Sequence, residues 1–216
     1  MDIVLFLIDF ILHIDQHLAS FAASHGAWVY GLLFLIVFVE TGLVVMPLLP
    51  GDSLLFVVGT LCGAGTMNLL LAIGLLWIAA VAGDQINYRI GQHFGPRVFR
   101  WEQSRFFNKR AFDRAHTFYE RYGGVTIILA RFMPFIRTFA PFVAGVAEMS
   151  RTRFIVFNAV GGILWVAGLT TAGFLFGNVA FVQQNLSTII GTLVLVPGLI
   201  ALFVAWNARR TAGHDN

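Results

Sequence analysis

Long apolar runs make up most of this sequence, and the first of them, residues 28–65, is broken in its middle. Pro47, Pro50 and Gly51 divide it into a first arm of about 19 residues and a second, residues 52–64, of about 13. A helix needs about 20 residues to cross the ~30 Å apolar core of a bilayer, and apolar segments of roughly 10–14 residues are more typical of re-entrant helices. The pattern therefore predicts a re-entrant helical hairpin over residues 28–65.

A second broken run covers residues 123–149, where Pro134 and Pro141 interrupt two shorter arms. Its topology follows from the basic residues on either side, because Lys and Arg are retained on the cytoplasmic face of a membrane. Seven of them precede the run and two follow it: Arg97, Arg100, Arg105, Lys109, Arg110, Arg114 and Arg121, then Arg151 and Arg153. A single span would separate the two groups, whereas a hairpin keeps both in the cytoplasm. We therefore predict a second re-entrant hairpin over residues 123–149, entered from the cytoplasm.

Three further apolar runs, residues 67–95, 154–177 and 186–206, are long enough to predict transmembrane helices. The last run ends shortly before Arg209 and Arg210, so the positive-inside rule places the C-terminus in the cytoplasm. The chain is therefore expected to be multi-pass, with about three transmembrane helices in addition to the two hairpins.

Two further segments distribute polar and apolar residues on opposite helical faces. Residues 1–22 have a polar face that includes Asp9 and His13, and residues 100–122 have a basic face. Both patterns are typical of helices in the membrane interface, the second on the cytoplasmic side, and the first leaves open whether its helix spans the membrane. No polar linker divides the chain, so residues 1–216 are expected to form one all-α polytopic membrane domain.

A weak internal repeat relates the two halves of the chain. A Tyr-Gly pair opens each hairpin, at residues 30–31 and 122–123, and each following span ends in a GxxxG pair, at residues 91–95 and 173–177. GxxxG pairs indicate close helix packing. Because the two hairpins enter from opposite sides, the repeats are expected to be inverted, as in many secondary transporters.

Composition agrees with a membrane protein and excludes several other classes. Hydrophobic residues make up 58% of the chain and charged residues 12%, and the mean hydropathy is +0.80, outside the range of a soluble domain. Cys62 is the single cysteine, so we expect no disulfide, no CxxC metal site and no cofactor. The net charge of +3 comes from basic residues beside apolar spans, so nucleic acid is not an expected partner.

Five charged residues fall at depth or at broken helix tips in this layout: Glu40, Asp52, Asp84, Arg131 and Arg137. Each costs about 2.5–3.5 kcal/mol at the bilayer centre if it faces lipid. They can neutralise one another as ion pairs that only hold the hairpins together, and this alternative stays open. The helix breaks and the repeat favour transport instead, with Arg131 and Arg137 gripping one phosphate from two sides, because the planar guanidinium binds phosphate bidentately.

The carboxylates of the first hairpin need a separate role, because Glu40 and Asp52 would repel a phosphate when ionised. Burial favours the neutral form of a carboxyl group, so both are candidate proton carriers. Candidate supporting residues lie beside the charged ones: Ser53, Asp84, Asn87, Tyr88 and Thr138. For Asp84 the leading alternative is structural, as a partner of Arg89 or in a helix-packing hydrogen bond.

Five segments taken together resemble the DedA family, or VTT family, of bacterial membrane proteins. They are FVETG at residues 38–42, PLLPGDSLL at 47–55, GDQINY at 83–88, RFMPFIRT at 131–138 and NAVGGILW at 158–165. The resemblance covers essentially the whole chain and implies an inner-membrane protein needed for envelope integrity, in which the acidic pair and the arginine pair are functional. It also implies proton-dependent transport, with undecaprenyl phosphate, phospholipids or drugs as substrates of different members.

These observations lead to the hypothesis that the chain is a transporter, not an enzyme, that moves undecaprenyl phosphate across the inner membrane with protons bound at Glu40 and Asp52. The alternatives are a glycerophospholipid flippase or scramblase and a proton-coupled antiporter for small cations or drugs. The PGDS segment at residues 50–53 partly matches the PGxS element of polyprenyl pyrophosphate phosphatases, but no Arg follows Ser53. Hydrolysis and a purely structural role are less favoured, and assembly into homo-oligomers stays open.

Overall fold

The structure, a computed structural model, describes residues 18, 20, 21, 24–43, 51–98, 122–177, 179 and 182. The helices among these residues are α3 (Trp28–Gly42), α4 (Gly51–Gly63), α5 (Leu69–Val98), α7 (Val125–Ala130), α8 (Pro134–Val146) and α9 (Arg151–Phe176). No strand occurs in these ranges. Nearly all of the predicted surface helix at residues 1–22, all but the last residue of the one at 100–122, the span at 186–206, and Pro47 and Pro50 lie outside the described residues.

Two helices, α5 and α9, are long and apolar enough to cross a membrane. Their apolar stretches, Leu69–Phe94 and Arg151–Phe176, have mean hydropathies of 2.0 and 1.7. Only 33% of the most apolar part of α5 and 39% of that of α9 is buried within the fold, so most of it faces outward. Large side chains such as Leu70, which is 80% exposed, would be unfavourable in water. The predicted spans at residues 67–95 and 154–177 are therefore present as long apolar helices.

The broken runs form pairs of short helices. The α3, α4 and α8 helices have 15, 13 and 13 residues, fewer than a crossing needs. The first residue of α4 is Gly51, and that of α8 is Pro134, whose fixed φ and missing N–H suit the first turn of a helix. Pro141 lies inside α8 without ending it.

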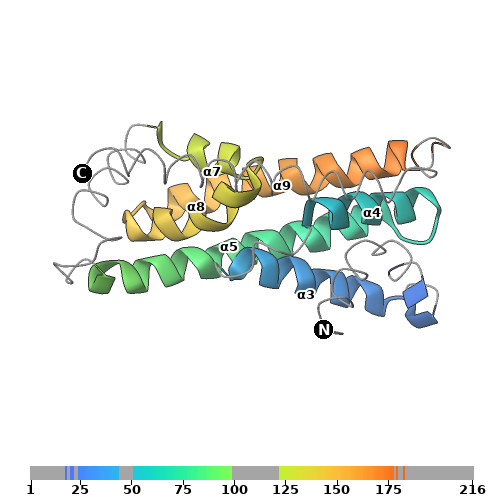
Figure 1. The fold of residues 1–216 in the computed structure, drawn as a ribbon, viewed down its shortest axis with the longest axis horizontal. Coiled ribbons are helices and arrows are strands. Elements are labelled where there is room, and N and C mark those ends of the chain that lie inside the picture. The colour runs from blue at the N-terminus through green and yellow to red at the C-terminus, as the bar shows by residue number, and fades with distance from the viewer. Residues whose placement is uncertain are drawn as a thin grey trace, which may run out of the picture.

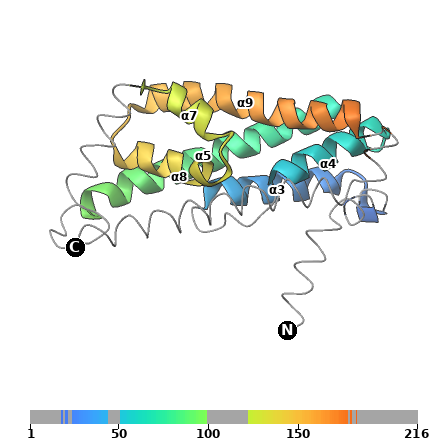
Figure 2. The same ribbon diagram turned by 45° about the horizontal axis from the view of Figure 1, so that its top comes forward.

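The short helices divide the length of α5 between them. Figure 1 shows α3 and α4 at the level of one half of α5 and α7 and α8 at the level of the other half, with α7 lying on α9 rather than on α5, and the same division is visible in Figure 2. In both views α3 ends, α4 begins, α7 ends and α8 begins near the middle of α5. Four helix ends therefore meet at one level of the bundle.

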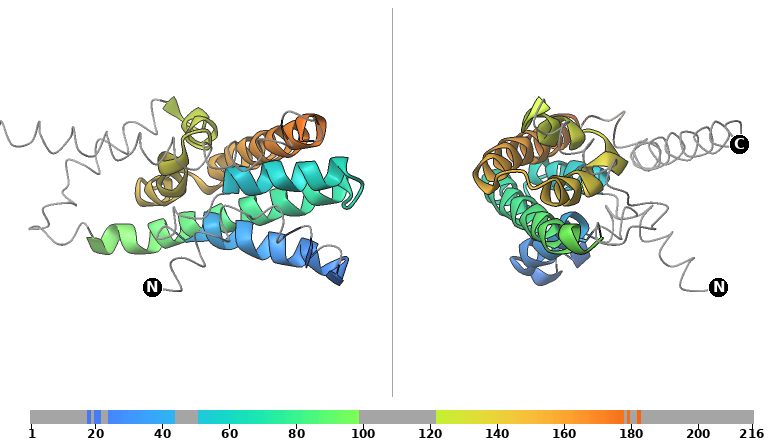
Figure 3. Two further views of the ribbon diagram at one scale, coloured as in Figure 1. Left: turned by 45° about the vertical axis from the view of Figure 1, so that its right-hand side comes forward. Right: turned by 90° about the vertical axis from the view of Figure 1, so that its left-hand side faces the viewer.

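The helices pack in a reciprocal pattern that crosses between the two halves of the chain. The second helix of each pair lies on the long helix of the other half, α4 on α9 and α8 on α5, whereas the first helix lies on the long helix of its own half, α3 on α5 and α7 on α9. Figure 3 shows the resulting bundle from two further sides. This exchange agrees with the predicted internal repeat, while its orientation in a membrane stays a prediction.

Glycines allow α4 and α9, and likewise α5 and α8, to pack with their backbones in contact. A Cβ atom on Gly59 of α4 would overlap the carbonyl oxygen of Thr170, and one on Gly173 of α9 would overlap that of Phe56. Between α5 and α8 the same holds for Gly91 and Gly145. Small residues at such crossings let apolar helices gain contact area at short range. Gly91 and Gly173 open the predicted GxxxG pairs, so the close packing predicted at these glycines is confirmed.

Substituting Gly173 by Ala should therefore destabilise the protein, because the new methyl group would overlap the backbone of α4. The matched control is Gly168→Ala on the same helix, where a Cβ would meet nothing within 4 Å. Removing glycine from such an open helical position is expected to stabilise it by about 0.5–1 kcal/mol. Thermal unfolding of the purified protein in detergent would check this. Equal melting temperatures for the two variants would contradict the packing described.

Candidate functional site

Five charged residues come together where the four helix ends meet. Glu40 is two residues before the end of α3, Asp52 is the second residue of α4, Arg131 follows α7, Arg137 is the fourth residue of α8, and Asp84 lies within α5. Glu40, Asp84, Arg131 and Arg137 are 1–7% exposed. The Asp52 side chain is 25% exposed and forms the accessible edge of the group.

Arg137 joins the two halves of the chain through two carboxylates. Its Nη2 lies 2.5 Å from Glu40 Oε1, and its Nη1 lies 2.6 Å from Asp52 Oδ1. A buried guanidinium is tolerated when its charge is compensated and its N–H groups are hydrogen-bonded. The acidic residues of the first helix pair are thus matched to an arginine of the second, so the ion pairing considered from the sequence is present.

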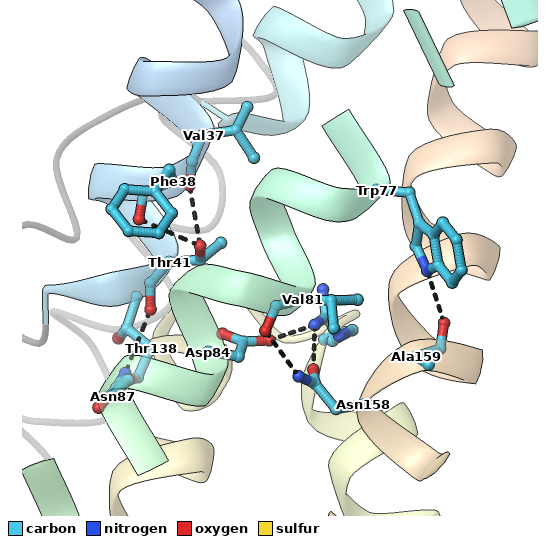
Figure 4. A network of polar contacts seen from close by, with 11 residues as sticks. Val37, Phe38, Thr41, Trp77, Val81, Asp84, Asn87, Thr138, Asn158 and Ala159 are labelled. Atoms are coloured by element: carbon cyan, nitrogen blue, oxygen red, sulfur yellow. Dashed lines mark hydrogen bonds and ion pairs between the residues drawn. The ribbon is translucent and has the colours of Figure 1, made fainter. Parts of the chain in front are cut away.

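Arg131 belongs to a second ion pair that connects α7 to both long helices. Its Nη2 donates to Asp84 Oδ2 on α5 and to Asn158 Oδ1 on α9. Asn158 in turn donates from Nδ2 to the carbonyl oxygen of Val81 at 3.2 Å (Figure 4). The suggested partnership of Asp84 with Arg89 is therefore wrong, since Arg89 is exposed and the buried carboxylate faces Arg131.

Trp165 of α9 lies beside both arginines. The guanidinium carbons of Arg137 and Arg131 are 4.7 and 5.9 Å from the centroid of its ring. Both are within the range of a cation–π interaction. The indole Nε1 donates to Asp52 Oδ1 at 2.8 Å, so Trp165 also holds a carboxylate.

Several buried polar atoms of this group have no hydrogen-bond partner in the described part of the chain. They are Glu40 Oε2, Ser53 Oγ, and the Nε atoms of Arg131 and Arg137. Buried polar groups are nearly always paired, so unpaired ones in a native site need an explanation. Three of these atoms, Ser53 Oγ and the two arginine Nε atoms, are hydrogen-bond donors. An anion with several oxygens would accept hydrogen bonds from donors of this kind.

Two of the predicted supporting residues bind backbone rather than the charged groups. Asn87 Nδ2 donates to the carbonyl oxygens of Thr41, at 3.3 Å, and Thr138, at 2.9 Å, and so ties α5 to α3 and α8 (Figure 4). Tyr88 donates to the carbonyl oxygen of Met149, which lies between the end of α8 and the start of α9. Asn87 thus borders the site, whereas Tyr88 fixes the connection between α8 and α9.

Gly51 permits the first turn of α4 to lie against Glu40. A Cβ on Gly51 would overlap the Glu40 carboxylate. The prediction of Gly51 as a hairpin break therefore understates its role, because it also provides room for a buried acid. Among the described residues, no three His, Cys, Asp or Glu side chains are placed to hold a metal ion.

The sequence analysis gave no role to two residues that the structure places in this site, Asn158 and Trp165. They lie seven residues apart on α9, which puts them on one helical face. A buried Asn in the middle of an apolar span is costly unless it is hydrogen-bonded, and that was a usable signal. Nothing comparable marked Trp165, because tryptophan is common in membrane helices.

Comparison with known proteins gives consistent relatives. A family model of the VTT domain matches residues 49–175. Protein DedA of Escherichia coli (strain K12) is 51% identical over 207 residues, which cover 94% of each chain. An uncharacterized membrane protein of Mycobacterium leprae is 49% identical over 82% of this chain and 79% of its own, and inner membrane protein YqjA of Escherichia coli is 34% identical over 81% and 79%. No solved structure matches the chain.

The Arg131–Asp84 pair predicts a compensating pair of substitutions. Arg131→Gln or Asp84→Asn alone leaves one buried charge without its partner, which typically costs about 3–5 kcal/mol. The double variant leaves no such charge, so its loss of stability should be well below the sum of the two. Denaturant unfolding in detergent micelles would measure this coupling. The matched control, Arg89→Gln, removes an exposed arginine from α5, and the pairing is disproved if that change lowers stability as much as Arg131→Gln.

Proposed function

This chain belongs to the DedA family of membrane proteins, and we propose that it is a proton-coupled transporter of a phosphate-bearing lipid. Undecaprenyl phosphate in the bacterial inner membrane is the substrate that we favour, as the family resemblance implies. The proposal assigns phosphate binding to Arg131 and Arg137 and proton binding to Glu40 and Asp52. No catalytic residue is needed in this scheme, because no bond of the lipid is broken.

The observation that carries the proposal is the pair of buried guanidiniums beside Trp165. Each keeps its Nε–H without a partner in the described residues, and Ser53 Oγ close in sequence to Asp52 is equally unpaired. Arginine stays charged in a buried site and binds phosphate oxygens in a fixed planar geometry. A lipid phosphate would supply acceptors for these donors while its tail stays in the bilayer.

The charge balance of the site supports coupling to protons. Three carboxylates (Glu40, Asp52, Asp84) face two guanidiniums (Arg131, Arg137), so the group carries 2 − 3 = −1 when all are ionised. A phosphate would be repelled from it. Protonation of Glu40 and Asp52 changes the balance to 2 − 1 = +1 and frees Arg137 from both of its partners. Proton binding would thus create the anion site.

The proposed membrane topology places this site near the bilayer midplane. In it α3–α4 and α7–α8 are re-entrant hairpins that enter from opposite sides, the chain is multi-pass and the C-terminus is cytoplasmic. Helix ends at that depth are tolerated where they are covered by protein or line a polar cavity rather than facing lipid. Broken helices meeting at the midplane are the usual substrate sites of secondary transporters.

Reconstitution tests the proposal. Proteoliposomes should move a fluorescent polyprenyl phosphate faster than empty liposomes, and the rate should change with an imposed pH gradient. In the triple variant Glu40→Gln, Asp52→Asn, Arg137→Gln no buried charge of the Arg137 cluster is left unpaired, so we expect it to fold but to lose at least about tenfold in rate, since charge-assisted pairs contribute roughly 1.5–3 kcal/mol each. Arg153→Gln, an exposed arginine of α9, is the control.

Two results of this experiment would reject the proposal. The first is wild-type protein that moves the lipid no faster than empty liposomes. The second is a triple variant with wild-type rate, which would leave the ion pairs with a structural role alone. A glycerophospholipid probe in the same vesicles separates a general flippase or scramblase from a polyprenyl phosphate transporter.

A second candidate, proton-coupled antiport of a small cation, is favoured by one specific observation. When all five charged groups are ionised the site has an excess of one negative charge, and Glu40 Oε2 has no hydrogen-bond partner in the described residues. A buried acceptor with excess negative charge suits a cation. Cation-driven proton release from proteoliposomes without any lipid probe, abolished by Glu40→Gln, would favour this function over lipid transport.

A further inference from the structure

Trp165 is placed as a hub of the charged site rather than as an ordinary core residue. It is 2% exposed and lies on α9, yet it contacts side chains from three other parts of the chain: Asp52 at the start of α4, Arg137 on α8 and Arg131 after α7. The first and second halves of the chain thus both reach the same indole.

The indole N–H acts on the same oxygen as the guanidinium. Asp52 Oδ1 accepts from Trp165 Nε1 at 2.8 Å and from Arg137 Nη1 at 2.6 Å. Two donors from different helices thus fix this carboxylate oxygen between α8 and α9. The indole carries no charge, so it holds Asp52 without changing the charge balance of the site.

Trp77 shows what a structural tryptophan of this fold does with its N–H. Its Nε1 donates to the carbonyl oxygen of Ala159 at 2.9 Å and so ties α5 to α9 (Figure 4). This bond also joins residues far apart in the chain, but its acceptor is a backbone carbonyl oxygen and not a carboxylate of the charged site. Trp165 instead uses its N–H on a carboxylate that is 25% exposed.

The ring of Trp165 has a second, separate function. Arg131 and Arg137 are like charges, and both guanidinium carbons lie within 6 Å of the ring centroid, at 5.9 and 4.7 Å. The negative face of an indole attracts cations, so it fixes guanidiniums without neutralising them. A carboxylate in this place would compete with a phosphate, whereas an aromatic ring leaves the charge of both arginines available.

We propose that Trp165 is a positioning residue with two separable roles: its N–H holds the Asp52 carboxylate beside Arg137, where Asp52 takes part in proton coupling, and its ring positions Arg131 and Arg137 for the phosphate. The inference rests on the proposed function for its meaning in transport. Two charged groups also act on Asp52: Arg137 of α8 binds the same oxygen, and the carboxylate of Glu40 on α3 repels that of Asp52.

Two substitutions separate the roles. Trp165→Phe keeps an aromatic face and removes the N–H, so the effect of an imposed pH gradient on the transport rate should fall about tenfold, the size expected for losing one hydrogen bond to a charged group, with little change in the apparent KM for fluorescent polyprenyl phosphate. Trp165→Gln keeps an N–H donor and removes the ring, so the KM should rise at least threefold with a smaller loss of the pH-gradient effect. Trp77→Phe and Trp77→Gln are the matched controls and should shift neither quantity.

A readout independent of transport tests the first role. Infrared spectra of the purified protein in vesicles should contain a carboxyl-group band that is missing in Asp52→Asn, and the frequency of this band should shift in Trp165→Phe, which removes one of its hydrogen bonds, but not in Trp77→Phe. An unchanged frequency, or a spectrum in which Asp52→Asn removes no band, overturns the inference. If wild-type vesicles move no polyprenyl phosphate, the proposed function fails while the infrared comparison still decides whether Trp165 controls Asp52.

Comparison with Trp165→Gln also tests whether the effects come only from disturbed packing. If Trp165→Phe and Trp165→Gln change the effect of the pH gradient and the KM together and to the same extent, the effects come from a general disturbance of packing and the two-role proposal is rejected. Opposite patterns in the two variants, with both Trp77 variants like wild type, support it.

Discussion

The need to compensate buried charge is the constraint on which this structure depends. Four of the five charged residues are almost fully buried, and each would be strongly unfavourable alone in an apolar environment. Glu40 and Asp52 require Arg137, and Arg131 requires Asp84 and Asn158. Each of these two groups of paired side chains contains residues from both halves of the chain. The ends of the short helices are therefore fixed at one level along α5. The helix breaks, the close contact of Gly51 with Glu40 and the hydrogen bonds of Asn87 to backbone carbonyl oxygens all help to bring these helix ends together.

Hydropathy and proline positions were sufficient to predict which segments are long helices and which are broken. The runs at residues 67–95 and 154–177 became α5 and α9, and the breaks before Gly51 and Pro134 separate short helices. The charged residues were also identifiable, because Glu40 or Arg131 within an apolar run is conspicuous. Their partners were not, since a sequence pattern gives residue depth along a helix but not the rotation of one helix against another. Asp84 therefore received Arg89 as its suggested partner instead of Arg131.

Trp165 shows a different limit of sequence interpretation. An indole in a membrane helix is compatible with lipid, core packing or a polar site, and only the position of α9 relative to α4 and α8 distinguishes them. The same helix contact brings Gly173 against α4, so the packing that required a glycine also positions the tryptophan. Helix packing and the electrostatics of the site are thus set by one surface of α9.

The exchange of partners between the two halves has a consequence for biosynthesis. The close-packing face of α4, centred on Gly59, fits α9, whose last residue follows the end of α4 by 113 positions (176 − 63). During translation α4 is therefore complete long before α9, its permanent neighbour in the fold, has been made. Glu40 and Asp52 likewise emerge before Arg137, so the nascent chain must hold two acids without their counter-charge. How these acids are compensated in that interval is part of the folding problem of this protein, and its first half is unlike a domain that can mature by itself.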